Sequence, residues 1–509
     1  MRGKQQRRCW PVLYVGFLCI TIISYATFNA IYSSFLSASK EGSIAVPPQL
    51  SYSGQHRCRA APLIPPGEKY MLFAPHSGFS NQVGEFKNAL FIAALLNRTL
   101  VVPPIFDHHA VALGSCPKFR VHEPHEMRAS AWAHISELIH ERRYLAVADV
   151  LDLSSVVPLV KLVDLRIFLF LWCGVDISSA CPGFLCRSLA AHILTSGETV
   201  ESCGDALMSK PDELHGSCVY GVDEDCRTTI WVHKNRFLEA NQSSPNLKEA
   251  TATIPKQDAS NKIVKRKYGQ RIYKEVVETL GNGSQASKYQ VLSFGSLFSS
   301  EYKGSQVHVD IESSKDPIIR SLVEAMKYIP FTPPIVNAGK LYSRNKIRKP
   351  FFCAQLRLLD GQFKNHWEKT FTSFRSQLKL AREQQGLSQI LDVFLMTDLP
   401  RSNWSKTYLG ELDVDKSYKL HTLDANDPLI QETANKLAKA EHGIHSGYLP
   451  PLKATQTDLE DLKPVWVHPD ILLFVEEAIC CCASLGFVGT SGSTLSAIIL
   501  QLRLGNICK

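Results

Sequence analysis

The stretch HSGFSNQVGEFKNALFIAALLNRTLVVPP, from His76 to Pro104, decides the fold of this chain. A short apolar run, Tyr70–Ala74, precedes it and predicts a strand. The stretch itself predicts a turn, then a helix with one apolar face, then a buried strand over Leu100–Val102 that Pro103 and Pro104 end. A strand, a glycine turn, a helix and a strand form the βαβ unit of a nucleotide-binding sheet.

The turn is the first candidate binding site. Gly78 is expected to let the backbone turn where a side chain would clash. Ser80 and Asn81 suit a helix start, and Glu85 suits the first turn. Free backbone N–H groups at such a helix start form an anion site suited to a diphosphate. An ordinary turn without a ligand explains the pattern equally well.

The N-terminus carries a membrane signal. Four basic residues lie within residues 1–9, and residues 10–35 carry no charge. This span predicts a transmembrane signal anchor with its short tail in the cytosol and the rest of the chain in the lumen. A cleaved signal peptide is the alternative, although its apolar core is shorter, about 7–15 residues. Residues 36–57 are small, polar and proline-bearing, which is typical of a stem.

Composition agrees with a secretory-pathway enzyme. Thirteen of the 15 cysteines follow the predicted anchor. Four N-glycosylation motifs do so as well, at Asn97, Asn241, Asn282 and Asn403. Both features fit an oxidising, glycosylating compartment, and we expect a single-pass type II protein of the Golgi membrane. The net charge of +8 suits an acidic ligand such as a nucleotide sugar, while no basic block points to nucleic acid.

Two domains are predicted beyond the stem, at residues 58–330 and 331–509. In the first, residues 144–150 suggest a further strand. A Cys-rich insertion, at about residues 160–270, has irregular cysteine spacings without a CxxC pair, which favours disulfides over zinc.

In the second domain, predicted strands and helices alternate along the chain. Strands are expected at residues 351–358, 390–397, 418–423 and 485–489, and helices at 367–384, 471–483 and 493–502. This order predicts mostly parallel sheets, and hence an α/β protein with two Rossmann-like domains facing a cleft.

Two further candidate sites lie in the second domain. Arg357, after Gln355 and Leu356, ends a predicted strand and can place a permanent charge on a diphosphate. The segment Gly489–Ser496 offers backbone and hydroxyl donors to phosphate oxygens. Glu477 could accept hydrogen bonds from a base or ribose. The alternatives are an arginine paired with Asp360 or Asp398, a helix cap at Ser493 or Thr494, and a solvent-facing glutamate.

No metal site is predicted. Asp413-Val-Asp415 and Asp223-Glu-Asp225 match the DxD letters of metal-dependent transferases but follow no buried strand. Cys480-Cys-Cys482 lies on an apolar helix, where adjacent side chains diverge and buried thiols are expected.

With these motifs in order, the chain resembles the plant branch of the protein O-fucosyltransferase family from about Tyr70 to Arg503. GFSNQ with NALFIAALLNRTLVVPP resembles the family's first motif, FCAQLRL its His-Leu-Arg strand, and FVGTSGSTLSAIILQLR its C-terminal motif. The resemblance implies a GT-B fold, GDP-fucose as donor, inversion at the sugar carbon and no required metal.

By the same resemblance, the catalytic residues are Arg357 and Asn81. The donor contacts it implies are Gly78, Phe79, Ser80, Asn81, Gln355, Leu356, Arg357, Glu477, Ser493, Thr494 and Leu495. Gln355 stands where the family has His, and Leu495 where it has Phe. Glutamine cannot titrate, so a proton-transfer role at that position is in doubt.

The mechanism lacks an evident base, because no carboxylate lies beside Asn81 in the sequence. Asp107, His76 and Asp360 are the weak candidates. We expect an inverting transfer of fucose from GDP-fucose to a hydroxyl of a luminal protein or glycan. The alternatives are another nucleotide sugar, a cell-wall polysaccharide acceptor, or an inactive donor-binding scaffold.

Overall fold

The computed structural model describes residues 67–107, 124–175, 199–208, 218–222, 268–297, 306–310, 315–359, 361–386, 389–440, 468–506 and 508. The predicted anchor and stem, most of the Cys-rich insertion, Asn241 and Asp360 lie outside these residues, as do Asp223 and Asp225. Within the described part of the chain, no helix is both long and apolar enough to cross a membrane.

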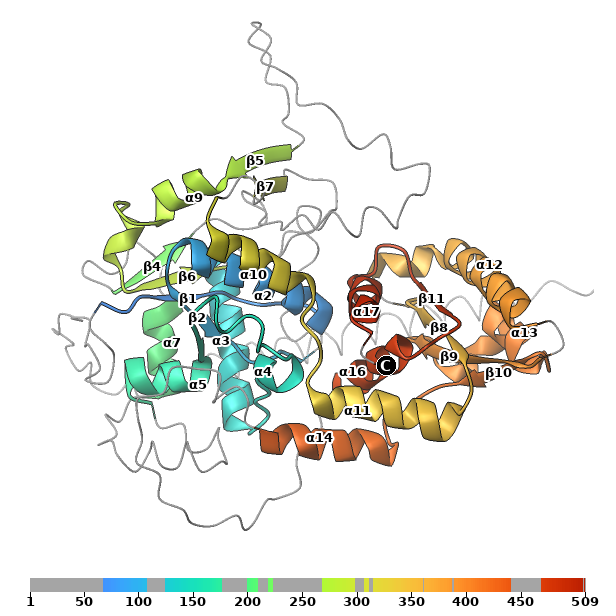
Figure 1. Ribbon diagram of the computed structural model, residues 1–509. Coiled ribbons are helices and arrows are strands. Elements are labelled where there is room, and N and C mark those ends of the chain that lie inside the picture. The colour runs from blue at the N-terminus through green and yellow to red at the C-terminus, as the bar shows by residue number, and fades with distance from the viewer. Residues whose placement is uncertain are drawn as a thin grey trace, which may run out of the picture. The chain divides into compact units, whose positions relative to one another are not determined.

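The first sheet is parallel and has the order β3-β2-β1-β6-β4 (Figure 1). Its strands are β1 (Tyr70–Leu72), β2 (Thr99–Val102), β3 (Leu162–Asp164), β4 (Val219–Val222) and β6 (Val291–Phe294). Helix α2 (Phe79–Leu95) joins β1 to β2, which pair in parallel. The predicted βαβ unit is therefore confirmed.

Alternate residues of these strands face two cores. Met71 and Leu100 pack with α2 and with α10 (Pro317–Lys327) on one face. Leu72 and Val101 pack with α3 (Pro124–His140) and α5 (Leu165–Phe168) on the other. This is the period of two that a buried strand requires, and it places helices on both faces of the sheet.

The second sheet is also parallel, with the order β10-β9-β8-β11. Its strands are β8 (Phe351–Leu356), β9 (Leu391–Thr397), β10 (Tyr418–His421) and β11 (Gly486–Gly489). Helix α12 (Trp367–Gln385) covers one face, and α11 (Pro333–Tyr342) and α16 (Ile471–Cys481) cover the other. All four predicted strands and the predicted helices of this region are present.

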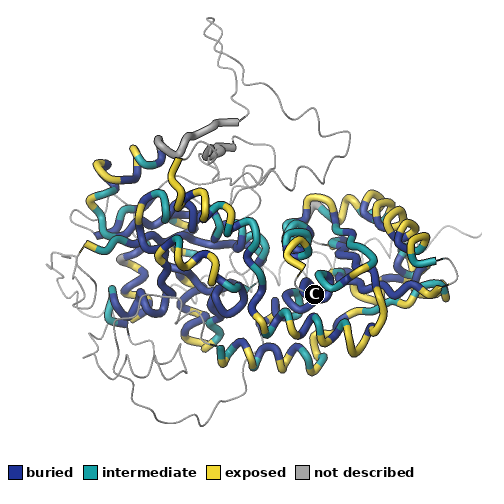
Figure 2. Tube along the Cα trace, in the orientation of Figure 1, coloured by how far each residue is buried: buried dark blue, intermediate teal, exposed yellow. Residues whose placement is uncertain are grey.

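The strands of the first sheet all precede Phe331, and those of the second all follow it. One core nevertheless includes Leu292 of β6, Phe474 of α16 and Cys353 of β8, and both sheets belong to one compact unit. Strands β1, β2, β8 and β9 are buried, and Figure 2 shows a largely exposed outer face on α12. The remaining elements are α4 (Val147–Val150), α7 (Val200–Met208), α9 (Tyr273–Leu280), α13 (Tyr408–Val414), α14 (Pro428–Ala440), α17 (Thr494–Leu504) and the parallel pair β5 (Tyr268–Ile272) and β7 (Gln306–Asp310).

One local prediction was wrong. Residues 144–150 form no strand but a single bridge, between Pro104 and Ala146, followed by the short helix α4. Thr332 holds this turn, because its hydroxyl donates to the Asp149 carbonyl at 2.7 Å. At the predicted domain boundary, helix α11 begins at Pro333, the first helical position, where no N–H is needed.

The cysteines form disulfides where both partners are described. Cys173 pairs with Cys203, Cys353 with Cys480, and Cys482 with Cys508. The expected buried thiols at Cys480 and Cys482 are therefore wrong, and Cys481 between them is a free thiol. The bond from Cys353 to Cys480 ties strand β8 to helix α16.

Candidate active site

Each sheet has one point where the strand order reverses. In the first sheet, β2 and β3 lie on one side of β1, and β6 and β4 lie on the other. In the second, β9 and β10 lie on one side of β8, and β11 lies on the other. Open parallel sheets bind ligands at the carboxyl ends of the strands at such switch points. The sequence motifs occupy both of them.

The second switch point joins two motifs. The Thr490 hydroxyl, just after β11, accepts the backbone N–H of Arg357, just after β8, at 2.9 Å. Ser496 of α17 donates to the side-chain oxygen of Gln355 at 2.6 Å. The strand end with Arg357 and the turn before α17 therefore form one structural unit, and Gln355 serves there as a buried acceptor.

The Arg357 side chain is half-buried. Burial lowers the pKa of its guanidinium from the ordinary value, and the negative charge of Asp398 opposes that shift. Asp398 itself accepts the backbone N–H groups of Leu358 and Leu359 at 2.7 and 3.0 Å. An arginine remains charged in any protein environment. This strand end therefore presents a fixed, partly desolvated positive charge.

The start of α17 offers further donors. Ser493 is the residue before the helix, but its side chain makes no capping hydrogen bond, so the alternative of a side-chain cap at Ser493 is not observed. Its hydroxyl is buried, with the residue 4% exposed, and has no hydrogen-bond partner among the described residues. Thr494 and Leu495 follow in the first turn, and Leu495 packs against the core. A buried unpaired hydroxyl beside free helix N–H groups fits an anionic ligand.

Glu477 does not face solvent. It is 1% exposed on α16, and its Oε2 has no hydrogen-bond partner within the described residues. Burial, together with the charges of Asp470 and Glu476, raises the pKa of Glu477 well above its ordinary value. Burial therefore favours the protonated form of this side chain, which can both donate and accept a hydrogen bond.

The first motif begins α2, but the turn differs from the expectation. Gly78 has an ordinary φ of −73°, and the left-handed residue is Ser77, with φ of 62°. Asn81 lies in the first turn, where its N–H bonds the Gly78 carbonyl at 2.9 Å. The Ser80 hydroxyl is buried without a partner in the described part of the chain.

Two of the implied donor contacts are core residues. The Phe79 ring lies 4.4 Å from that of Phe474 and 6.4 Å from that of Phe331. Leu356 is buried against α12. Helix α2 also meets α17, because Lys87 donates to Gln501 at 3.0 Å. The turn at Gly78–Asn81 and the segment Gly489–Ser496 therefore begin two helices, α2 and α17, that pack side by side.

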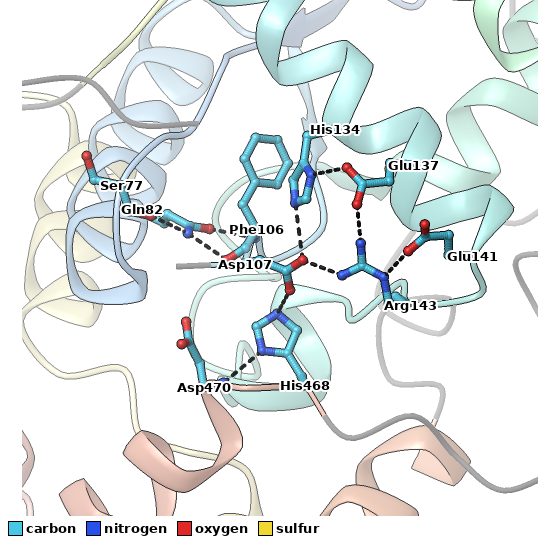
Figure 3. A network of polar contacts seen from close by, with 10 residues as sticks. All are labelled: Ser77, Gln82, Phe106, Asp107, His134, Glu137, Glu141, Arg143, His468 and Asp470. Atoms are coloured by element: carbon cyan, nitrogen blue, oxygen red, sulfur yellow. Dashed lines mark hydrogen bonds and ion pairs between the residues drawn. The ribbon is translucent and has the colours of Figure 1, made fainter. Parts of the chain in front are cut away.

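A charged cluster that the sequence did not reveal lies at the end of β2 (Figure 3). The carboxylate of Asp107 forms an ion pair with Arg143, and its Oδ1 lies 3.3 Å from Nε2 of His468. His134 approaches it at 3.7 Å. Of these residues the sequence analysis named only Asp107, as a candidate base, because its three partners lie elsewhere along the chain.

This cluster reaches the start of α16. His468 accepts the Asp470 backbone N–H at 3.2 Å, and burial lowers the pKa of His468 to about 4 despite the nearby Asp107. Burial and the charge of Asp107 raise the pKa of Asp470 to about 7. With its carboxylate engaged by Arg143 and facing His468, Asp107 is a poor candidate for the base.

His76, the other described candidate for the base, lies at the first switch point. Its Nε2 is 2.8 Å from Glu85 Oε1, so Glu85 forms a buried pair rather than a favourable charge at the helix start. Within the described ranges, no group of three or more His, Cys, Asp and Glu side chains is arranged to hold a metal ion. Asp413 and Asp415 are exposed, and Asp413 pairs with Arg401.

Comparison with known proteins gives one strong relationship. The chain is 41% identical to O-fucosyltransferase 30 of Arabidopsis thaliana over 511 residues, which cover 98% of this chain and 93% of that protein. Among solved structures, POFUT1 in its apo form is 13% identical, with 86% of this chain and 96% of that chain covered and a TM-score of 0.38. POFUT1 with GDP-fucose is also 13% identical, with coverages of 87% and 95% and a TM-score of 0.38. No protein-family model matches the chain.

Proposed function

Because the chain belongs to the O-fucosyltransferase family, we propose that it transfers fucose from GDP-fucose to a hydroxyl group of an acceptor. The observation that carries this proposal is the second switch point. There, Thr490 holds the backbone of Arg357 beside the start of α17, where the buried Ser493 hydroxyl has no partner among the described residues. A cation, helix N–H groups and a free hydroxyl together suit a diphosphate.

In the transfer, the acceptor oxygen attacks the sugar carbon while the bond to the diphosphate breaks. The leaving GDP gains negative charge as it departs. Arg357 stabilises that charge in a partly desolvated position, where it acts more strongly than in water. Ser493 and the first N–H groups of α17 bind the phosphate oxygens. Glu477 can form hydrogen bonds with the guanine base or the ribose of GDP. Asn81 orients the donor and the acceptor.

The proposal extends to features supported by the sequence alone. The enzyme has a GT-B-like organisation, inverts the sugar carbon and needs no metal. The uncharged span at residues 10–35 anchors it in the Golgi membrane, with the catalytic part in the lumen and a protein or glycan as acceptor. The asparagine side chains of three of the four glycosylation motifs, Asn97, Asn282 and Asn403, are exposed, which is compatible with a luminal location.

The test is the release of GDP from GDP-fucose by the purified full-length chain, together with direct binding of GDP. Arg357→Ala should lower kcat by roughly 10²–10³-fold, as losing one charge-stabilising group does. Arg401→Ala is the matched control, because Arg401 is exposed and, among the described residues, pairs with Asp413 and lies over the Trp404 ring, both in the helical segment after β9. Absence of GDP binding would overturn the site. Tight binding without turnover would indicate an inactive scaffold instead.

A further inference from the structure

A buried chain of polar side chains lies at the first switch point. His76 follows β1, Ser296 follows β6, and Glu85 reaches them from α2. His76 Nδ1 is 2.8 Å from the Ser77 hydroxyl, and its Nε2 is 2.8 Å from both Ser296 Oγ and Glu85 Oε1. His76 is 2% exposed and Glu85 is 0% exposed. Residues far apart in the chain thus converge on one imidazole.

The hydrogen-bond pattern around His76 is consistent with one assignment of its protons. Ser296 donates its single hydroxyl proton to Glu85 Oε1 at 3.0 Å. With Glu85 ionised, both neighbours of His76 Nε2 present lone pairs, and this arrangement assigns the imidazole proton to Nε2. A neutral imidazole with a proton on Nε2 has a lone pair on Nδ1. Nδ1 consequently accepts the hydroxyl proton of Ser77.

The backbone presents Ser77 at the start of the first motif. With φ of 62°, Ser77 adopts a conformation that is costly for a residue with a side chain and that recurs at functional sites. Gln82 stabilises the turn, because its amide donates to the carbonyls of Ser77 and Phe106 at 2.9 and 3.0 Å (Figure 3). Ser77 therefore has a defined orientation one residue before Gly78.

We infer that Ser77, backed by His76 and Glu85, is the base that deprotonates the acceptor hydroxyl. This inference rests on the proposed fucosyl transfer. The acceptor oxygen forms its bond to the sugar carbon as the bond to GDP breaks and the electron pair leaves with the diphosphate. The acceptor proton passes to Ser77 Oγ, while the Ser77 proton passes to His76 Nδ1. The resulting imidazolium later returns its proton through Ser77 to water.

Glu85 stabilises the charged imidazole that this step produces. Burial raises the pKa of the Glu85 carboxyl, and His76 counteracts that rise through its charge and its side-chain and backbone hydrogen bonds. The carboxylate of Glu85, 2.8 Å from His76 Nε2, lies where it can match a positive charge on the imidazole in the buried site. The same order of hydroxyl, imidazole and carboxyl activates nucleophiles in other enzymes. Here it serves the acceptor and forms no bond to the sugar.

The test compares Ser77→Gly and His76→Asn with the wild-type full-length chain, using GDP-fucose as donor and water as acceptor when no other hydroxyl is supplied. Glycine tolerates a φ of 62°, so Ser77→Gly removes the hydroxyl without straining the turn. Both variants should lower kcat by roughly 10²–10⁴-fold, the usual contribution of a general base. The KM for GDP-fucose should change by less than about threefold, and the solvent isotope effect on kcat should change.

Ser402→Ala, at an exposed position, is the matched control and should retain the wild-type kcat. Glu85→Gln should give an intermediate loss of kcat, because it keeps the shape but removes the charge. A kcat within about threefold of the wild type in Ser77→Gly, with an unchanged isotope effect, would overturn the relay. If the wild-type chain itself released no GDP, the proposed function would fail rather than the relay alone.

Discussion

The hydroxyl of Thr490 accepts the backbone N–H of Arg357 at 2.9 Å and donates to the carbonyl of Gln355 at 3.2 Å. These contacts join the end of β8 to the turn after β11, two segments more than 130 residues apart in the chain. The position of Arg357 therefore depends on the turn after β11, which contains Thr490, as much as on strand β8. Removing the Thr490 hydroxyl should therefore disturb both the strand end with Arg357 and the turn before α17.

Thr490→Val keeps the side-chain shape but leaves the Arg357 N–H without its acceptor. We expect a stability loss of about 1–3 kcal/mol and a lower kcat, because the arginine loses its fixed position. Thermal unfolding and GDP release measure the two effects. Thr407→Val is the control, since Thr407 caps α13 and its loss should cost similar stability without lowering kcat. Equal kcat values in both variants would refute the coupling.

Gly489→Ala should displace the start of α17. A Cβ at this position would lie 2.3 Å from Ser496 Oγ and 2.5 Å from Ser496 Cβ, too close for either to remain in place. We expect a stability loss of about 1–3 kcal/mol and weaker GDP binding, measured by thermal unfolding and calorimetry.

Gly84→Ala is the matched control for this change. A Cβ at Gly84, within α2, would meet nothing within 4 Å, so the variant should gain about 0.5–1 kcal/mol from the better helix propensity of alanine. The prediction fails if Gly489→Ala binds GDP as tightly as the wild type.

Asp470→Asn should stabilise the protein most at high pH. The pKa of Asp470 is raised from 3.8 to about 7, so the folded state holds this proton more tightly than the unfolded state does. Stability from this group is complete below pH 3.8 and is lost as the pH rises through 7. The advantage of asparagine should therefore grow by about 3 kcal/mol between pH 5 and pH 8.

Chemical denaturation of the full-length chain at these two pH values measures that advantage. Asp205→Asn, at an exposed position on α7, is the control and should show little pH-dependent difference. An advantage for Asp470→Asn that is the same at both pH values would show that the carboxyl is not held in its protonated form.

Phe79→Ala should act chiefly on stability. The ring packs between Phe331 and Phe474, and truncating such a buried ring costs about 3–5 kcal/mol. Phe79→Leu refills part of the space and should recover much of that loss. If Phe79→Leu kept the wild-type melting temperature but raised the KM for GDP-fucose strongly, a direct donor contact would be the main role of this residue.

Elements with strong local patterns were predictable. The β1-α2-β2 unit and the strands and helices of the second sheet followed from runs of apolar residues at fixed periods, bounded by Gly and Pro. Residues 144–150 have the composition of a strand but form α4, because Thr332, far along the chain, bonds the carbonyl of Asp149. The local β-propensity of residues 144–150 does not include the effect of a residue so distant in the sequence.

By itself, the sequence determined the α/β class, the β1-α2-β2 unit, the strands of the second sheet and the three motifs, because hydrophobic periodicity and turn residues act locally. Tertiary structure alone decided which motifs meet. Parallel pairing puts Arg357 beside Thr490 and His76 beside Ser296, since each pair follows adjacent strands at a switch point. The tertiary structure also decided the role of Glu85. The sequence placed it as a favourable charge at a helix start, whereas burial and the contact with His76 make it the partner of that imidazole.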